Sequence, residues 1–227
     1  FRRVLFRSGS SNLSVVAILW GFMINIEEIK LYNPGVLLTK LDDETFSQVK
    51  ENMYSQINPE EALKSLKENT FSFSGSNPDL NFKIDTGFTR VLTDMFSEYS
   101  KRFNYHTGNK FAVSRNAWVN YQRKTEFNQL HYHSDIAVFV LYVSIPYKIE
   151  DELQQPSDKV IYPPKASLFE FVYSKIDGEI HQQNLHIDKS WEGTVIMFPA
   201  YMLHQVYPFY TSNDYRISIA GNVRLLK

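Results

Sequence analysis

The pattern of apolar and polar positions divides the chain into a helical first half and a β-rich second half. Between residues 28 and 108, apolar residues recur every three to four positions, which is the period of an amphipathic helix. Helices are predicted over residues 41–57, where Asp42 can act as the N-cap, over 58–69, and over 88–103. We expect their apolar stripes to pack against the rest of the domain.

From about residue 110 the pattern changes to short runs of β-branched and aromatic residues. The runs are separated by Gly, Pro, Asn and Asp, which are typical of turns. Seven or so strands at short spacing predict a sandwich or a jelly roll, so the fold class is mainly β with N-terminal helices. The longest irregular stretch is residues 147–165, and a loop of this length in a β-domain is often a lid or a binding loop.

Composition supports a sheet-based core and argues against nucleic acids and anionic membranes as partners. Aromatic residues make up 15% of the 227 residues, and aromatic side chains are enriched in strands. The net charge of −1 gives no global attraction to nucleic acids or anionic membranes, and no basic patch interleaved with aromatics stands out. The chain has no cysteine, which excludes disulfides and cysteine-ligated metal sites. We expect a cytoplasmic protein with a small-molecule or protein substrate, and the oligomeric state stays open.

The apolar run near the start of the sequence is not expected to span a membrane. The apolar run at residues 15–24 is too short to span a bilayer. Residues 4–8 read like the translation of a sequencing adapter, so we expect residues 1–12 to be an artefact or a disordered tail. Residues 13–227 are then predicted to form a single domain, with helical support over 28–108 and a β core over 110–225.

Candidate metal ligands alternate at the start of one predicted strand. His131, His133 and Asp135 lie two residues apart, so their side chains share one face wherever the chain is extended. A further ligand must come from another strand, and His204 follows a strand and a proline-marked turn. Two histidines and one carboxylate, with open positions, form the facial arrangement of non-haem Fe(II) oxygenases. The sequence therefore predicts an iron site at this place.

A candidate carboxylate-binding group follows the distal histidine. Arg216 comes about a dozen residues after His204, and Ser218 lies on the same strand face as Arg216. A guanidinium can hold a carboxylate through two parallel hydrogen bonds, and a neighbouring hydroxyl can add a third. Tyr142, on the strand that follows the histidines, can donate another. This group predicts a carboxylate-bearing cosubstrate beside the metal.

These motifs together resemble a known family, the 2-oxoglutarate/Fe(II)-dependent dioxygenases. The similarity is greatest to the prolyl-hydroxylase-like branch and to oxygenases of marine phages and bacteria, and it runs from about residue 115 to 224. The matching residues are Trp118-Val119-Asn120, Phe127-Asn128, His131-Tyr132-His133, Phe198-Pro199, His204-Gln205-Val206, Pro208, Arg216-Ile217-Ser218 and Asn222.

The resemblance implies a fold and a chemistry. The fold would be a double-stranded β-helix (a cupin-like jelly roll) with helices packed on one sheet. The cofactors would be Fe(II), 2-oxoglutarate as cosubstrate and O2, with ascorbate as an accessory reductant. The expected activity is hydroxylation of a protein side chain or a small metabolite, with release of succinate and CO2. The expected location is the cytoplasm of a bacterium or of a phage-infected cell.

The resemblance leaves two ligand sets open, so we expect three of four residues to bind the metal. In the first set, His133, Asp135 and His204 are the ligands. In the second, His131 is the first ligand and His133 takes the place of the carboxylate. The second set follows from the spacing between Tyr121 and His131, which resembles that between a cosubstrate-side tyrosine and the first ligand of prolyl hydroxylases. Tyr121 would then lie beside the cosubstrate.

Two other functions compete with the oxygenase. One is a non-catalytic jelly-roll module that binds carbohydrate or forms part of a virion. The other is a cupin-like metalloenzyme that does not use 2-oxoglutarate. Arg216 and Ser218 favour the oxygenase, because neither alternative requires a carboxylate-binding arginine near the histidines.

Overall fold

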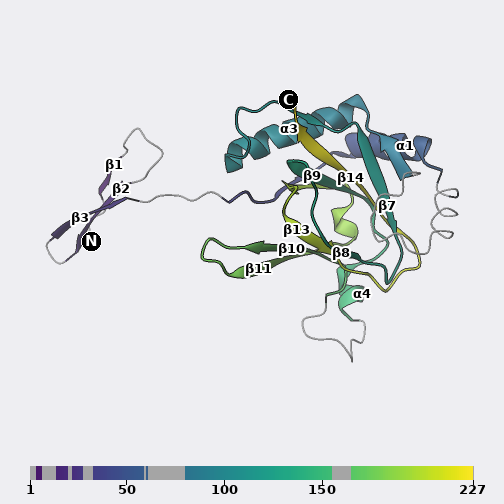
Figure 1. Cartoon of the computed structure of the whole chain (residues 1–227). Helices are drawn as coiled ribbons and strands as arrows, with labels where there is room; N and C mark the ends of the chain where they lie inside the picture. Colours follow the sequence, from purple (N-terminus) through teal and green to yellow (C-terminus); the bar gives the residue numbers. More distant parts are fainter. Residues whose placement is uncertain are drawn as a thin grey trace. The chain divides into compact units, whose positions relative to one another are not determined.

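The chain forms two compact units, Phe1–Asn33 and Pro34–Lys227 (Figure 1). The computed structural model describes residues 33–58, 60, 80–154 and 165–226, and in the first unit the backbone of three strands. These are β1 (Val4–Phe6), β2 (Ser14–Leu19) and β3 (Phe22–Glu27), which form an antiparallel sheet in that order. The predicted helix at 58–69 lies outside the described residues, except for two positions. The origin of residues 1–12 and the domain boundary there stay predictions.

Two helices of the second unit begin where the sequence places capping residues. In α1 (Asp43–Gln56), the Asp42 carboxylate accepts a hydrogen bond from the Thr45 amide at 2.8 Å. In α3 (Thr86–Phe103), Asp85 caps in the same way, and the helix ends at Asn104 in the left-handed conformation. The helices predicted over 41–57 and 88–103 are therefore confirmed. Within the described residues, no helix is long and apolar enough to cross a membrane.

Two sheets make up the rest of the described second unit. The larger sheet has the order β4-β12-β9-β14-β7-β5, with β6 also paired to β14, and the smaller sheet has the order β11-β10-β13-β8. Their bounds are β4 (Leu37–Lys40), β5 (Asn81–Lys83), β6 (Phe111–Val113), β7 (Asn116–Gln122), β8 (Asn128–His131), β9 (Ala137–Ser144), β10 (Leu168–Ser174), β11 (Ile180–His186), β12 (Thr194–Pro199), β13 (Leu203–Val206) and β14 (Arg216–Leu225).

From β7 to β14 the chain crosses repeatedly between these two sheets. This arrangement is a double-stranded β-helix, and the predicted fold class is confirmed. The helices α1 and α3 lie on the outer face of the larger sheet (Figure 1). The inner face looks toward the smaller sheet across a second apolar core, which includes Phe169, Phe171 and Phe198.

In the strands at the centre of the larger sheet, successive side chains alternate strictly between the two faces, so each strand contributes to both cores. On β7, Ala117, Val119 and Tyr121 pack toward the helices, whereas Trp118 and its alternate neighbours point between the sheets. The strands β9 and β14 alternate in the same way. The space between the two sheets is therefore lined by every second residue of three neighbouring strands.

Candidate metal and cosubstrate site

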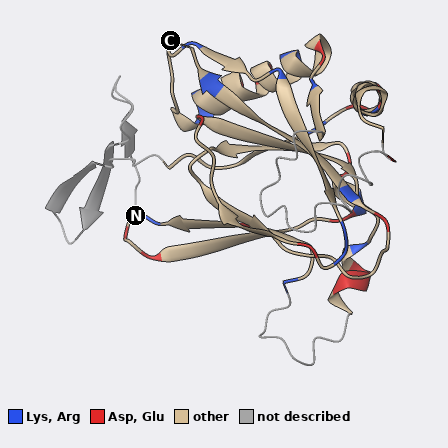
Figure 2. Cartoon of the chain, turned by 45° about the vertical axis from the view of Figure 1, so that its right-hand side comes forward, with Lys and Arg blue, Asp and Glu red and all other residues tan. Residues whose placement is uncertain are grey.

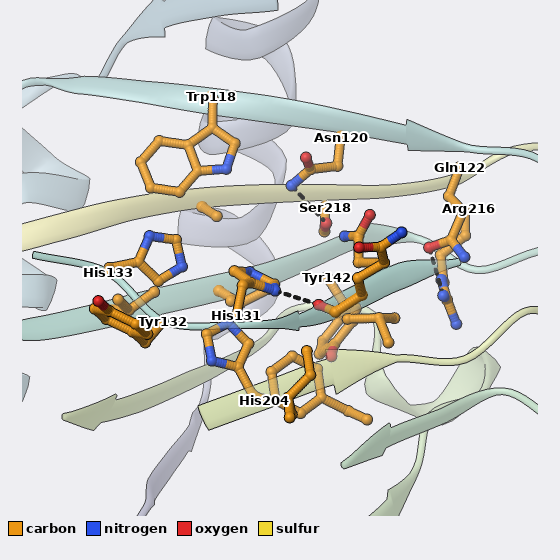
Figure 3. A pocket seen from close by; sticks show the side chains of 18 of the residues that line it. Trp118, Asn120, Gln122, His131, Tyr132, His133, Tyr142, His204, Arg216 and Ser218 are labelled. Carbon is orange, nitrogen blue, oxygen red and sulfur yellow. Dashed lines mark hydrogen bonds between the residues drawn. The ribbon is translucent and has the colours of Figure 1, made fainter. Parts of the chain in front are cut away.

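Three histidines converge at one place between the sheets (Figure 3). His131 ends β8, His133 follows two residues later, and His204 lies on β13. The register of β13 with β8 places His204 opposite His131. One nitrogen from each of the three rings lies within 4.8 Å of the other two. This distance suits three ligands of a single metal ion.

Hydrogen bonds to the backbone orient two of the three rings. The Nδ1 atom of His131 lies 2.6 Å from the Gln129 carbonyl oxygen, and Nδ1 of His204 lies 2.9 Å from the Met202 carbonyl oxygen. A carbonyl oxygen only accepts, so each Nδ1 must carry the proton. The lone pair is then on Nε2 in both rings, as a metal ligand requires. The third ring, His133, stacks on Trp118 with centroids 5.6 Å apart.

The surroundings hold two of these histidines in the neutral form. Burial, and then the nearby His131, lower the pKa of His133 to about 4 and that of His204 to about 3. The ring of Phe169 stacks on His204 at an interplanar angle of 5°, which contributes to that burial. A neutral imidazole is the form that binds a metal, so both rings are ready for ligation near pH 7.

Asp135 does not join this group. It is absent from the three-residue cluster and from the residues that line the surrounding cavity. The expectation that it shares a face with the histidines required an extended chain, but β8 ends at His131 and the chain bends at residues 134–136. The His133 amide donates instead to the Ala200 carbonyl oxygen at 2.8 Å. The structure brings together His131, His133 and His204, and leaves Asp135 outside.

The histidines form part of the wall of a cavity of about 520 Å³. Its other walls come from β7, β8, β9, β13 and β14, so it lies in the β-helix. Other residues that line it include Trp118, Asn120, Gln122, Asn128, Gln129, Leu130, Tyr132, Tyr142, Arg216, Ser218 and Asn222 (Figure 3).

Arg216 is a buried cation in this cavity, and only 3% of the residue is exposed. Its guanidinium donates hydrogen bonds to the Tyr147 hydroxyl at 2.7 Å, to the Gln122 side-chain oxygen, and to the Tyr207 carbonyl oxygen at 3.0 Å. All three acceptors are neutral, and within the described part of the chain no carboxylate pairs with this guanidinium. A buried charge is costly without a counter-charge, so the position suits a carboxylate ligand.

The Tyr142 hydroxyl also lacks a partner that a carboxylate ligand would supply. It is buried, and the described residues offer it no hydrogen-bond partner. Burial raises its pKa and the charge of Arg216 lowers it, so the hydroxyl stays a protonated donor near that guanidinium. Ser218 also lines the cavity, and its hydroxyl oxygen accepts a hydrogen bond from the side-chain amide of Asn120 at 3.4 Å. Arg216, Ser218 and Tyr142 all line this one cavity.

Tyr121 is not part of this cavity. Its ring packs in the core between the larger sheet and the helices, with its centroid 6.0 Å from that of Tyr215. The reason is alternation, because Trp118, Asn120 and Gln122 occupy the cavity face of β7 and Tyr121 must face the other way. The expectation that Tyr121 lies beside the cosubstrate is therefore corrected to a place in the helix-side core.

The sequence analysis did not predict two polar partners of Arg216. Gln122 follows Asn120 at the alternate position of β7, so the spacing itself contained the signal. Tyr147 lies beyond the end of β9, where no periodicity indicates which way a side chain points. Only the fold brings Tyr147 to the guanidinium.

An acidic residue fixes the segment that precedes Arg216. The short helix α4 (Ile149–Leu153) is strongly acidic (Figure 2), yet Glu152 on it is buried. Its carboxylate accepts hydrogen bonds from the amides of Tyr210 at 2.8 Å and Thr211 at 2.9 Å, and from the Thr211 hydroxyl. The negative charge is therefore used to hold a turn, and it does not neutralise the arginine.

A β-helix with converging imidazoles and a buried arginine in one cavity defines a candidate centre for a single metal ion and an anionic cosubstrate. Residues 116–222 match the family model described as "Putative 2OG-Fe(II) oxygenase". This segment is therefore similar to the 2-oxoglutarate/Fe(II) oxygenases, as the motifs predicted. A search of the curated proteins found no match.

Solved structures are similar to this chain at low sequence identity. An oxidoreductase of the 2OG-Fe(II) oxygenase family from Burkholderia pseudomallei is 16% identical, with a TM-score of 0.40, and the match covers 62% of this chain and 52% of that one. A prolyl-4-hydroxylase from Pseudomonas putida is 11% identical, with a TM-score of 0.47, over 85% of this chain and 94% of that one. The chain thus spans about half the length of the first protein.

Proposed function

We propose that the chain is an Fe(II)- and 2-oxoglutarate-dependent dioxygenase that hydroxylates a small metabolite or a protein side chain. The observation that carries the proposal is Arg216, a buried cation with no described anionic partner, in the same cavity as three histidines that can share one metal. The family match supports the coarser statement, an oxygenase that uses 2-oxoglutarate and Fe(II).

Each side chain has a role in this proposal. His131, His133 and His204 hold the iron, and Asp135 does not. Three imidazoles would leave further coordination positions for the cosubstrate and O2. With iron and 2-oxoglutarate bound, the site supplies an oxidation in which O2 gives one oxygen atom to succinate, formed with loss of CO2, and the other to a C–H bond of the substrate.

The cosubstrate side of the cavity is built from Arg216, Ser218 and Tyr142. The guanidinium neutralises the distal carboxylate of 2-oxoglutarate, and the two hydroxyls donate hydrogen bonds to it. Gln122 and Tyr147 already hold the guanidinium in place, so little side-chain freedom is lost when the carboxylate arrives. The apolar rings behind the histidines keep water away from the metal-binding face.

The test is an anaerobic titration of Fe(II) and 2-oxoglutarate into the metal-free protein. A weak visible charge-transfer band is expected when both are bound. The band should be lost in His204→Ala and retained in His186→Ala, a matched control whose histidine is exposed and outside the cluster. Iron binding without the band would favour a cupin-like metalloenzyme that does not use 2-oxoglutarate. Absence of iron binding would leave a jelly-roll binding module.

A further inference from the structure

One wall of the cavity is formed by six consecutive residues of the chain, 128–133. Successive side chains of a strand point to opposite faces, so a cavity inside the β-helix should touch only every second residue. It does so on β7, β9 and β14, where the lining residues alternate strictly. Contact with all six positions means that the cavity runs along the edge of β8 and past its end.

That edge is not covered by another described strand, although the Gln129 carbonyl oxygen on β8 already lies 2.6 Å from Nδ1 of His131. The strand β8 is the outermost of the smaller sheet, and β13 is its only partner among the described strands. The larger sheet has a similar edge on the opposite wall of the cavity. There β5 pairs with β7 only as far as Trp118, so no described strand pairs with the β5-facing edge of residues 119–122. An unpaired strand edge presents N–H and C=O groups at the two-residue repeat of another strand.

The side chains on this part of the cavity are polar but carry no formal charge. Asn120, Asn128 and Gln129 offer carboxamides, and the buried Oδ1 atom of Asn222 has no hydrogen-bond partner among the described residues. Among the described residues, Arg216 is the one Lys, Arg, Asp or Glu in the lining, and its charge belongs to the cosubstrate side. Such a surface recognises amide groups and does not favour a phosphate backbone.

We infer that the primary substrate is an extended polypeptide segment whose main chain pairs with the free edge of β8. This inference rests on the proposed oxygenase function and names the substrate class of the same site. Strand addition to a sheet edge is a common way to bind a peptide, because the backbone supplies affinity and alternate side chains supply specificity. A small metabolite would have no use for a strand edge beside the histidines.

The geometry also says which residue of the segment would react. A paired strand lies roughly 4.8 Å from its neighbour, and β8 ends at His131. The segment residue opposite His131 therefore has its side chain beside the histidine cluster, and its neighbours two positions away reach the carboxamides. The exposed side chains at the rim, Leu130 at 45% and Tyr132 at 60%, would cover apolar residues of the segment. The modified side chain is neutral, because no described acidic or basic group faces it apart from Arg216.

The experiment starts from a display library of random decapeptides. The library is selected against the full chain, loaded with Fe(II) and 2-oxoglutarate in the absence of O2. Each enriched peptide is then resynthesised with a single N-methyl group at each position in turn, which removes one main-chain donor at a time. Edge pairing predicts losses of about 3–10-fold in affinity at alternate positions and little loss between them. Losses without this two-residue period, or no enriched peptide, would overturn the inference.

Hydrogen exchange supplies a second readout on the same complexes. The amides of residues 128–132 should exchange more slowly when peptide is bound. The control is β11, which forms the opposite edge of the same sheet and should not change. Protection at β11, or at neither edge, counts against the inference. A charge-transfer band without periodic N-methyl effects would refute only the substrate class, whereas periodic effects without a band would refute only the oxygenase.

Discussion

Replacing Arg216 by Met should remove cosubstrate binding and leave the fold almost intact. A guanidinium that grips a carboxylate makes two charge-assisted hydrogen bonds, each of about 1.5–3 kcal/mol. The affinity for 2-oxoglutarate should therefore fall by about 10²–10⁴-fold. Stability should change little, because the loss of three hydrogen bonds to neutral acceptors is offset when a buried cation is removed from a site with no described counter-charge. We expect a change in the free energy of unfolding within about 2 kcal/mol.

Two measurements on the same variant separate a binding role from a structural one. Denaturant unfolding of the metal-free protein gives the stability, and anaerobic titration of the iron-loaded protein gives the affinity for 2-oxoglutarate. Arg224→Met is the matched control, because Arg224 lies on the same strand but is exposed, and it should change neither quantity. A large loss of stability with unchanged affinity would show that Arg216 only supports the fold, and the reasoning from its burial would fail.

Three further predictions concern the ligand set, protonation and packing. In isothermal titration of the metal-free protein with Mn(II), His131→Ala should weaken binding more than tenfold and Asp135→Ala less than twofold; the reverse order would favour the carboxylate ligand set. Because the pKa of His204 is lowered to about 3, the unfolded chain binds the proton first as the pH falls below 6.5, so stability should fall from pH 6.5 toward pH 4. Denaturant unfolding in EDTA should show a shallower pH dependence for His204→Gln, and identical curves would contradict this. Gly221→Ala should destabilise by about 1–3 kcal/mol, because the new Cβ would lie 2.6 Å from the Phe139 ring; an unchanged thermal midpoint would refute this.

The sequence predicted the parts of the site that depend on alternation within a strand. Ser218 lies two positions from Arg216 on β14, and both line the cavity. His131 and His133 also converge, although β8 ends between them. The distal His204 joins them through the register of β13 with β8, which the order of strands in a jelly roll implies but local sequence does not contain.

Two candidate residues lie away from the site because tertiary structure overrides the local pattern. Asp135 continues the spacing of the histidines, but a bend at residues 134–136 takes it out of the strand geometry. Tyr121 was placed by its distance along the chain from His131, whereas its face on β7 decides where it points. Tyr142 lies in a continuous apolar run, which contains no alternation by which its face could be assigned.

The two faces of β14 have a consequence for how this scaffold can change. Arg216, Ser218, Ala220 and Asn222 face the cavity, while the residues between them pack against the helices. Substitutions at the even-numbered positions can alter the cavity without disturbing the apolar contacts on the other side, since only the backbone is common to both. On β7 too, the even-numbered residues face the cavity and the odd-numbered residues pack against the helices. A library that keeps Arg216 and randomises positions 118, 120, 220 and 222 should therefore retarget the pocket while most variants still fold, which makes the β-helix a favourable starting point for engineering new specificity.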